Sequence, residues 1–168
     1  MHAFLRFALF VCTAALLTAA EPFLTVRSAD KTLTFSAAEF AALPHQSITV
    51  TDPHSHAERH FSGVAVREIL TRAGAPLGEK LRGRALATAI IARATDGYTV
   101  VFALAEFDPA FSSRTLLLAD AEDGKPLLAN TAPLKLIAPG DTKAARWARQ
   151  ITSLELVSLG DAPSPKKS

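Results

Sequence analysis

The chain has 168 residues, with 18 lysines and arginines against 16 acidic residues, and a single cysteine, Cys12. This length suits one domain with a sizeable hydrophobic core. A net charge of +2 is too small for the concentrated basic face with which a dedicated nucleic-acid binder neutralises phosphates. We therefore expect no nucleic-acid partner.

Residues 1–20 have the pattern of a cleaved secretory signal peptide. Arg6 is the only lysine or arginine before Glu21, an apolar run covers residues 7–17, and small residues precede the break after Ala20. These three features mark a secretory signal, and the run is shorter than the roughly 20 residues that span a membrane. We expect a periplasmic or secreted protein, cleaved near Ala20 and without membrane contact afterwards. The alternative is a retained membrane anchor.

Cleavage would leave 148 of the 168 residues, with 17 basic and 16 acidic side chains and no cysteine. Such a chain has no disulfide, no thiolate metal ligand and no cysteine nucleophile. The structured domain is predicted to cover residues 22–160. Residues 161–168 contain two prolines, two lysines and small polar residues, a composition typical of a disordered tail.

Short apolar or alternating runs between turn residues predict about eight or nine strands. In chain order they are residues 24–27, 32–35, 47–51, 58–61, 87–94, 98–104, 116–119, 134–138 and 151–159. The first two are expected to form a hairpin.

Three or four short helices are predicted among these strands. Ser36 and Glu39 have the spacing of a capping box at the start of the first, which Pro44 ends. A second helix over residues 66–73 should end at Gly74, and Asp141 should cap one or two turns over residues 143–149. Because helices and strands do not alternate regularly, we expect an α+β fold with mostly antiparallel or mixed strands.

Three of the histidines lie close together in the sequence, at His54, His56 and His60, with Asp52 beside them. Imidazole and carboxylate groups are ligands for Zn or Cu. The pattern indicates a candidate metal site, and the alternative is a polar hairpin tip exposed to solvent.

A second candidate lies between Asn130 and Ile151, where Lys135, Lys143, Arg146 and Arg149 occur. On a helix, residues three apart share a side, and clustered cations suit an anionic group such as a phosphate. The alternative is a solvated basic surface. The chain has no Gly-x-Ser-x-Gly motif, no phosphate-binding glycine loop and no dinucleotide fingerprint.

Several segments, taken in order, resemble the molybdopterin-binding domain of the sulfite-oxidase-like oxidoreductases. That family has an Asn-Gly-x-Pro-Leu-Arg segment, an apolar strand with Pro, a Lys/Arg-Trp stretch and a final strand. The residues here are Asn130-Thr131-Ala132-Pro133-Leu134-Lys135, Pro139, Arg146-Trp147 and Ile151. Upstream, residues 61–70 (FSGVAVREIL), 96–98 with 104–106, and 119–120 with 123–127 are also similar. The resemblance covers residues 46–158.

The resemblance implies that Asn130, Lys135, Lys143 and Arg146 occupy cofactor-binding positions, with molybdopterin as the possible cofactor. Catalytic members bind molybdenum through a cysteine, which would fall within residues 51–60 of this chain. That region has three histidines and no cysteine, and imidazole does not replace a soft thiolate without changing the electronics of the metal. The resemblance therefore implies a short member without catalytic residues and without a bound cofactor.

Three hypotheses follow. The first is an exported, non-catalytic domain that binds a small anionic ligand or a periplasmic protein partner through the face from Asn130 to Arg149. The second is a molybdopterin-dependent oxidoreductase, or a subunit of one. The third is a metal-binding module built on His54, His56 and His60.

Overall fold

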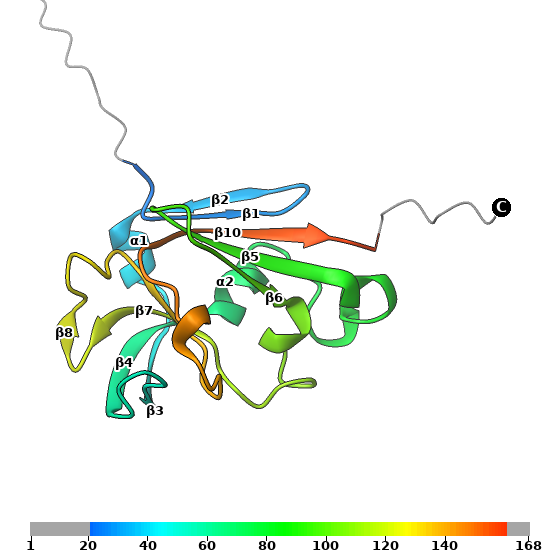
Figure 1. Ribbon diagram of the computed structural model, residues 1–168. Coiled ribbons are helices and arrows are strands. Elements are labelled where there is room, and N and C mark those ends of the chain that lie inside the picture. The colour runs from blue at the N-terminus through cyan, green and yellow to red at the C-terminus, as the bar shows by residue number, and fades with distance from the viewer. Residues whose placement is uncertain (1–20, 161–168) are drawn as a thin grey trace, which may run out of the picture.

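A computed structural model describes residues 21–160, so the predicted signal peptide and tail lie outside the described residues. These residues form an α+β fold, as predicted, with ten strands in two sheets (Figure 1). The strands are β1 (Leu24–Arg27), β2 (Thr32–Phe35), β3 (His45–Thr51), β4 (Glu58–Ala65), β5 (Thr88–Ala94), β6 (Thr99–Ala103), β7 (Leu117–Glu122), β8 (Lys125–Pro126), β9 (Lys135–Ile137) and β10 (Ile151–Ser158). The short strand β8 was not predicted.

The first sheet has the strand order β2-β1-β10-β5-β6. The predicted hairpin of β1 and β2 is present, and β10 pairs with β5 in an antiparallel register. All neighbouring strands of this sheet pair antiparallel except β1 and β10, which pair parallel with Thr25 opposite Ser153. The first and last strands of the domain therefore meet inside one mixed sheet.

The second sheet has the order β3-β4-β7-β8, and β9 also pairs with β7. All of these pairs are antiparallel. The register between β4 and β7 shifts at Gly63, where a Cβ atom would lie only 2.1 Å from the carbonyl oxygen of Leu118 and 2.6 Å from the Cα of Ala119. Only glycine fits at this contact between the two strands.

The expectation of three or four helices was wrong: residues 21–160 form two α-helices, α1 (Ala37–Ala41) and α2 (Val66–Arg72). The remaining helical turns are 3-10, at η1 (Gly78–Lys80), η2 (Gly83–Ala87), η3 (Leu104–Phe107) and η4 (Ala144–Arg146). Two of the predicted helix-boundary signals are confirmed. The capping box of Ser36 and Glu39 is formed at α1, and Gly74 follows α2 with a φ of +83°.

The helix predicted over residues 143–149 is reduced to the single turn of η4, and Asp141 does not cap it. Backbone hydrogen bonds to the neighbouring strand explain this. The N–H of Leu136 donates to the carbonyl of Ala148 at 2.8 Å, and the N–H of Ile151 donates to that of Leu134 at 2.9 Å. These contacts tie the backbone of Ala148 and Ile151 to the segment of β9, so these two groups are not available for helical hydrogen bonds.

Apolar side chains from both sheets and from α2 fill one core, with Phe61, Ile69 and Phe102 at most 1% exposed. Trp147 joins this core, because its indole N–H donates to the carbonyl of Ala138 at 2.9 Å and its ring meets Phe61 edge to face. Within residues 21–160, neither α-helix has the length or the apolar character required to cross a bilayer.

Candidate functional site

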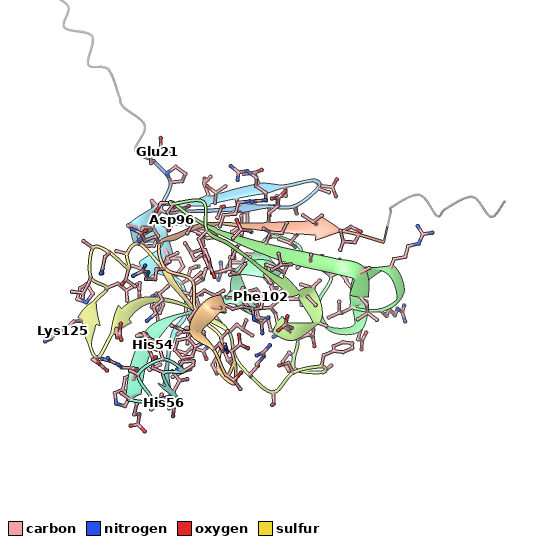
Figure 2. The ribbon with its side chains drawn as sticks, in the orientation of Figure 1. Glu21, His54, His56, Asp96, Phe102 and Lys125 are labelled. Carbon is pink, nitrogen blue, oxygen red and sulfur yellow. The ribbon has the colours of Figure 1, made fainter. Side chains whose placement is uncertain are left out.

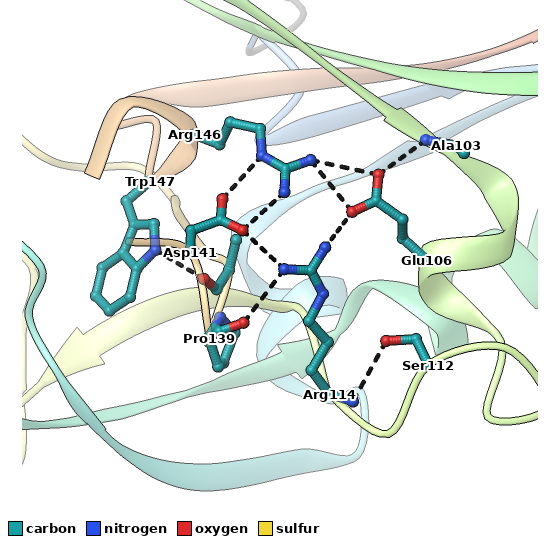
Figure 3. Close-up of polar contacts among 9 residues, drawn as sticks. Ala103, Glu106, Ser112, Arg114, Pro139, Asp141, Arg146 and Trp147 are labelled. Carbon is teal, nitrogen blue, oxygen red and sulfur yellow. Dashed lines mark hydrogen bonds and ion pairs between the residues drawn. The ribbon is translucent and has the colours of Figure 1, made fainter. Parts of the chain in front are cut away.

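Four charged side chains from separate segments meet beside the first sheet (Figure 3). They are Glu106 on η3, Arg114 in the loop before β7, Asp141 in the loop after β9, and Arg146 on η4. Carboxylates and guanidinium groups alternate around this group of four, which we call the ion-pair ring. Its formal charges sum to zero.

Asp141 contacts both arginines of the ring. Its carboxylate accepts hydrogen bonds from Nε and Nη2 of Arg146 at 2.8 and 2.7 Å, and from Nη1 of Arg114 at 2.7 Å. The same Nη1 lies 3.4 Å from the carbonyl oxygen of Pro139. The fork geometry between Asp141 and Arg146 is the bidentate arrangement that gives arginine–carboxylate pairs their strength.

Glu106 closes the ring on the opposite side. Its carboxylate accepts from Nη1 of Arg146 at 3.2 and 3.3 Å and from Nη2 of Arg114. One of its oxygens also accepts from the backbone N–H of Ala103 at 3.1 Å, which fixes η3 to the end of β6. The guanidinium of Arg146 lies over the ring of Phe102 at 4.4 Å.

The ring is partly shielded from water, since the side chain of Asp141 is 11% exposed and that of Arg146 is 33% exposed. Burial acts to raise the pKa of Asp141, but the hydrogen bonds and charges of Arg146 and Arg114 outweigh it and lower the pKa below its ordinary value. Hydrogen bonding to Asp141 likewise raises the pKa of Arg146. Asp141 and Arg146 are therefore a charged pair near neutral pH.

The predicted cofactor-binding residues fall into different settings. Arg146 belongs to the ion-pair ring, so its charge is already neutralised. Lys135 is 14% exposed, with its ammonium 4.7 Å from the centre of the Phe61 ring and 3.9 Å from the carboxylate of Glu122. Both cations thus have partners within the chain.

Asn130 and Lys143 are more open. The side-chain oxygen of Asn130 accepts from the hydroxyl of Thr131 at 3.2 Å, whereas Lys143 has no hydrogen bond or ion pair within residues 21–160. Lys143 and Arg146 line one shallow pocket together with Asp141. Neither Asn130 nor Lys135 lines that pocket, so the four residues do not surround a common one.

Figure 2 shows His54 and His56 in the connection between β3 and β4. His60 lies on β4, where its Nδ1 is 2.8 Å from the hydroxyl of Thr49 on the neighbouring strand. The described residues contain no group of three or more His, Cys, Asp or Glu side chains arranged to hold a metal ion. The geometry therefore gives no support to the metal-binding hypothesis, which stays a prediction.

Sequence reasoning did not identify Glu106 and Arg114 as site residues, and it gave Asp141 the role of a helix cap. Glu106 and Arg114 are eight residues apart, and both lie more than twenty residues from Asp141. Only the packing of η3 against the loops beside β7 and β9 brings them together. A local pattern cannot predict such a contact.

The two sheets and two short helices define an α+β domain whose fold also occurs in an oxidoreductase. Among solved structures, the chain is similar to the sulfane dehydrogenase SoxCD from Paracoccus pantotrophus, with a TM-score of 0.61 and 15% sequence identity. The match covers 80% of this chain and 38% of that chain, so it shows a shared fold with part of that protein. No protein-family model matches the sequence, and neither does any curated protein.

Proposed function

We propose that this chain is an exported, non-catalytic domain that binds a small anionic ligand, built on the fold of the sulfite-oxidase-like molybdopterin-binding domains. Export rests on the signal pattern of residues 1–20. The absence of catalysis rests on the residues that stand where the cofactor would be held.

The observation that carries the proposal is the ion-pair ring. An anionic cofactor requires cations that are free to meet its phosphate. Arg146, the arginine that the resemblance assigns to the cofactor, is instead bound to Glu106 and Asp141. An incoming phosphate would meet these two carboxylates as well, and like charges repel it.

The side chains at the position of the molybdenum ligand do not suit this cofactor either. Residues 21–168 contain no cysteine, and the segment that would carry the thiolate offers imidazoles, at His54, His56 and His60, and carboxylates instead. The residues present therefore do not suit molybdopterin, and we derive no reaction from it. Arg67 and Lys143 are among the cations that have no ion pair within residues 21–160, and they remain available to a smaller anion.

The test is metal analysis together with pterin fluorescence on the mature protein purified from the exported fraction. We expect less than stoichiometric molybdenum and no pterin, and no dye-coupled oxidation of sulfite or reduction of a sulfoxide. Stoichiometric molybdenum with pterin would overturn the proposal in favour of the oxidoreductase hypothesis. The intact mass of the same sample tests export, since cleavage near Ala20 removes Cys12.

A further inference from the structure

A cavity of about 390 Å³ lies beside the ion-pair ring, whose Arg114 is one of its lining residues. It lies where β4 passes into α2 and where the loop from η3 leads to β7. Its lining residues are Gln46, Ala65, Arg67, Phe107, Pro109, Ser112, Ser113, Arg114, Thr115 and Leu116. We call it the Arg67 cavity. Its volume is in the range of small-molecule pockets.

Arg67 supplies the available positive charge of this cavity. Its side chain is exposed and has no hydrogen bond or ion pair within residues 21–160. The other lining arginine, Arg114, directs its guanidinium into the ion-pair ring (Figure 3). The cavity therefore carries one free guanidinium.

The charge of Arg67 acts on the carboxylate of Asp108, but no hydrogen bond or ion pair joins the two side chains. Asp108 is 2% exposed, and its carboxylate accepts from the backbone N–H of Gly78 at 2.6 Å and from that of Ala110 at 3.0 Å. These hydrogen bonds and the charge of Arg67 lower the pKa of Asp108. Asp108 does not line the cavity.

The rest of the lining combines hydroxyl donors with an apolar surface. Ser113 and Thr115 are exposed, and Ser112 accepts the backbone N–H of Arg114 at 3.4 Å, which leaves its own O–H free to donate. Pro109 is exposed and Ala65 is half-buried, and both present carbon atoms to the cavity, whereas the lining residues Phe107 and Leu116 are only 6% and 2% exposed. One guanidinium, several hydroxyls and an apolar wall match an anionic head on a short apolar body.

We infer that the Arg67 cavity is the binding site for a small organic acid, whose carboxylate meets Arg67 and the hydroxyls while its apolar part lies against Pro109 and Ala65. The inference rests on the proposed function as an anion-binding domain, and it moves the site away from the face between Asn130 and Arg149.

Benzoate is a suitable probe, and benzamide is its uncharged control of nearly the same shape. Titration of the mature protein, followed by the backbone amide shifts of residues 112–116, should show saturable binding of benzoate. Benzamide should bind roughly tenfold more weakly or worse, because the charge-assisted hydrogen bond to Arg67 is lost. Equal binding of both compounds would overturn the inference.

The substitution Arg67→Gln should weaken benzoate binding by roughly tenfold or more, while Arg67→Lys keeps the charge without the fork geometry and should fall in between. Arg27→Gln removes an equal charge from a residue that does not line the cavity, and it should leave the affinity unchanged. An unchanged affinity in Arg67→Gln, or an equal loss in Arg27→Gln, would overturn the inference.

Inorganic phosphate, which has charge but no apolar part, tests whether the apolar wall contributes to binding beside Arg67 and the hydroxyls. Phosphate that binds more tightly than benzoate would contradict the apolar wall as a recognition element. Absence of benzoate binding overturns only the inference about the Arg67 cavity. The proposal of a non-catalytic domain is tested separately, by the molybdenum and pterin analysis.

Discussion

Asp141 holds the guanidinium of Arg146 with both carboxylate oxygens, at 2.8 Å to Nε and 2.7 Å to Nη2. One of those oxygens also accepts from Arg114. A single carboxylate therefore joins η4, the loop before β7 and the loop after β9.

Asp141→Asn should destabilise the domain by about 2 kcal/mol, because two partly shielded guanidinium groups would then share one carboxylate. Urea unfolding followed by the fluorescence of Trp147, the only tryptophan, measures this. The matched control is Glu68→Gln, which breaks an exposed pair with Arg72 and should cost about 0.5 kcal/mol. Equal losses in the two variants would contradict the shielded role of the ring.

The contribution of Asp141 to the unfolding free energy should depend on pH and be lost in acid. The pKa of Asp141 is lower in the folded state than its ordinary value of 3.8, so its contribution is complete above that value and disappears as the pH falls through the folded pKa. The difference in unfolding free energy between wild type and Asp141→Asn should shrink steadily below about pH 4. A difference that stays constant down to about pH 2 would disprove this linkage.

His45 should make the domain more stable in mild acid. Its Nδ1 lies 2.8 Å from the carbonyl oxygen of Leu43 and its Nε2 lies 3.0 Å from Asp120; since both partners are acceptors, both ring nitrogens donate in the protonated form. Burial lowers the pKa of His45, but the two hydrogen bonds and the charge of Asp120 outweigh it and raise the pKa above 6.5.

This contribution is therefore complete below pH 6.5 and is lost as the pH rises through the folded pKa. The melting temperature of the wild type should fall from about pH 6 to about pH 8 more than that of His45→Gln. Asp120→Asn should show the same flattened profile. Parallel profiles for all three proteins would rule out the His45–Asp120 pair as the source.

Gly63→Ala should destabilise the domain by about 3 kcal/mol or more, because the added methyl group meets the backbone of Leu118 and Ala119 rather than a movable side chain. Chemical unfolding measures the loss. Ser62→Ala, at the neighbouring position of β4, adds no atom and should change the stability by less than about 1 kcal/mol. A Gly63→Ala variant as stable as Ser62→Ala would contradict the close approach of the two strands.

The sequence determined the local elements of this protein. The capping box of Ser36 and Glu39 and the glycine after α2 were predicted, because each depends on residues within one turn of the chain. Most strands were predicted for the same reason, since alternation of apolar residues is a local property. The α+β class followed from the order of these elements.

Tertiary structure alone decided how the elements meet. The parallel pair of β1 and β10 joins residues over a hundred positions apart, and the turn of η4 replaces a predicted helix because residues 147–151 bond to β9. Arg146 looked like a free cation in the sequence, yet Glu106 lies forty positions away and neutralises it. Local patterns carry no information on such contacts, because the free energy that forms them arises only when distant segments pack and exclude water.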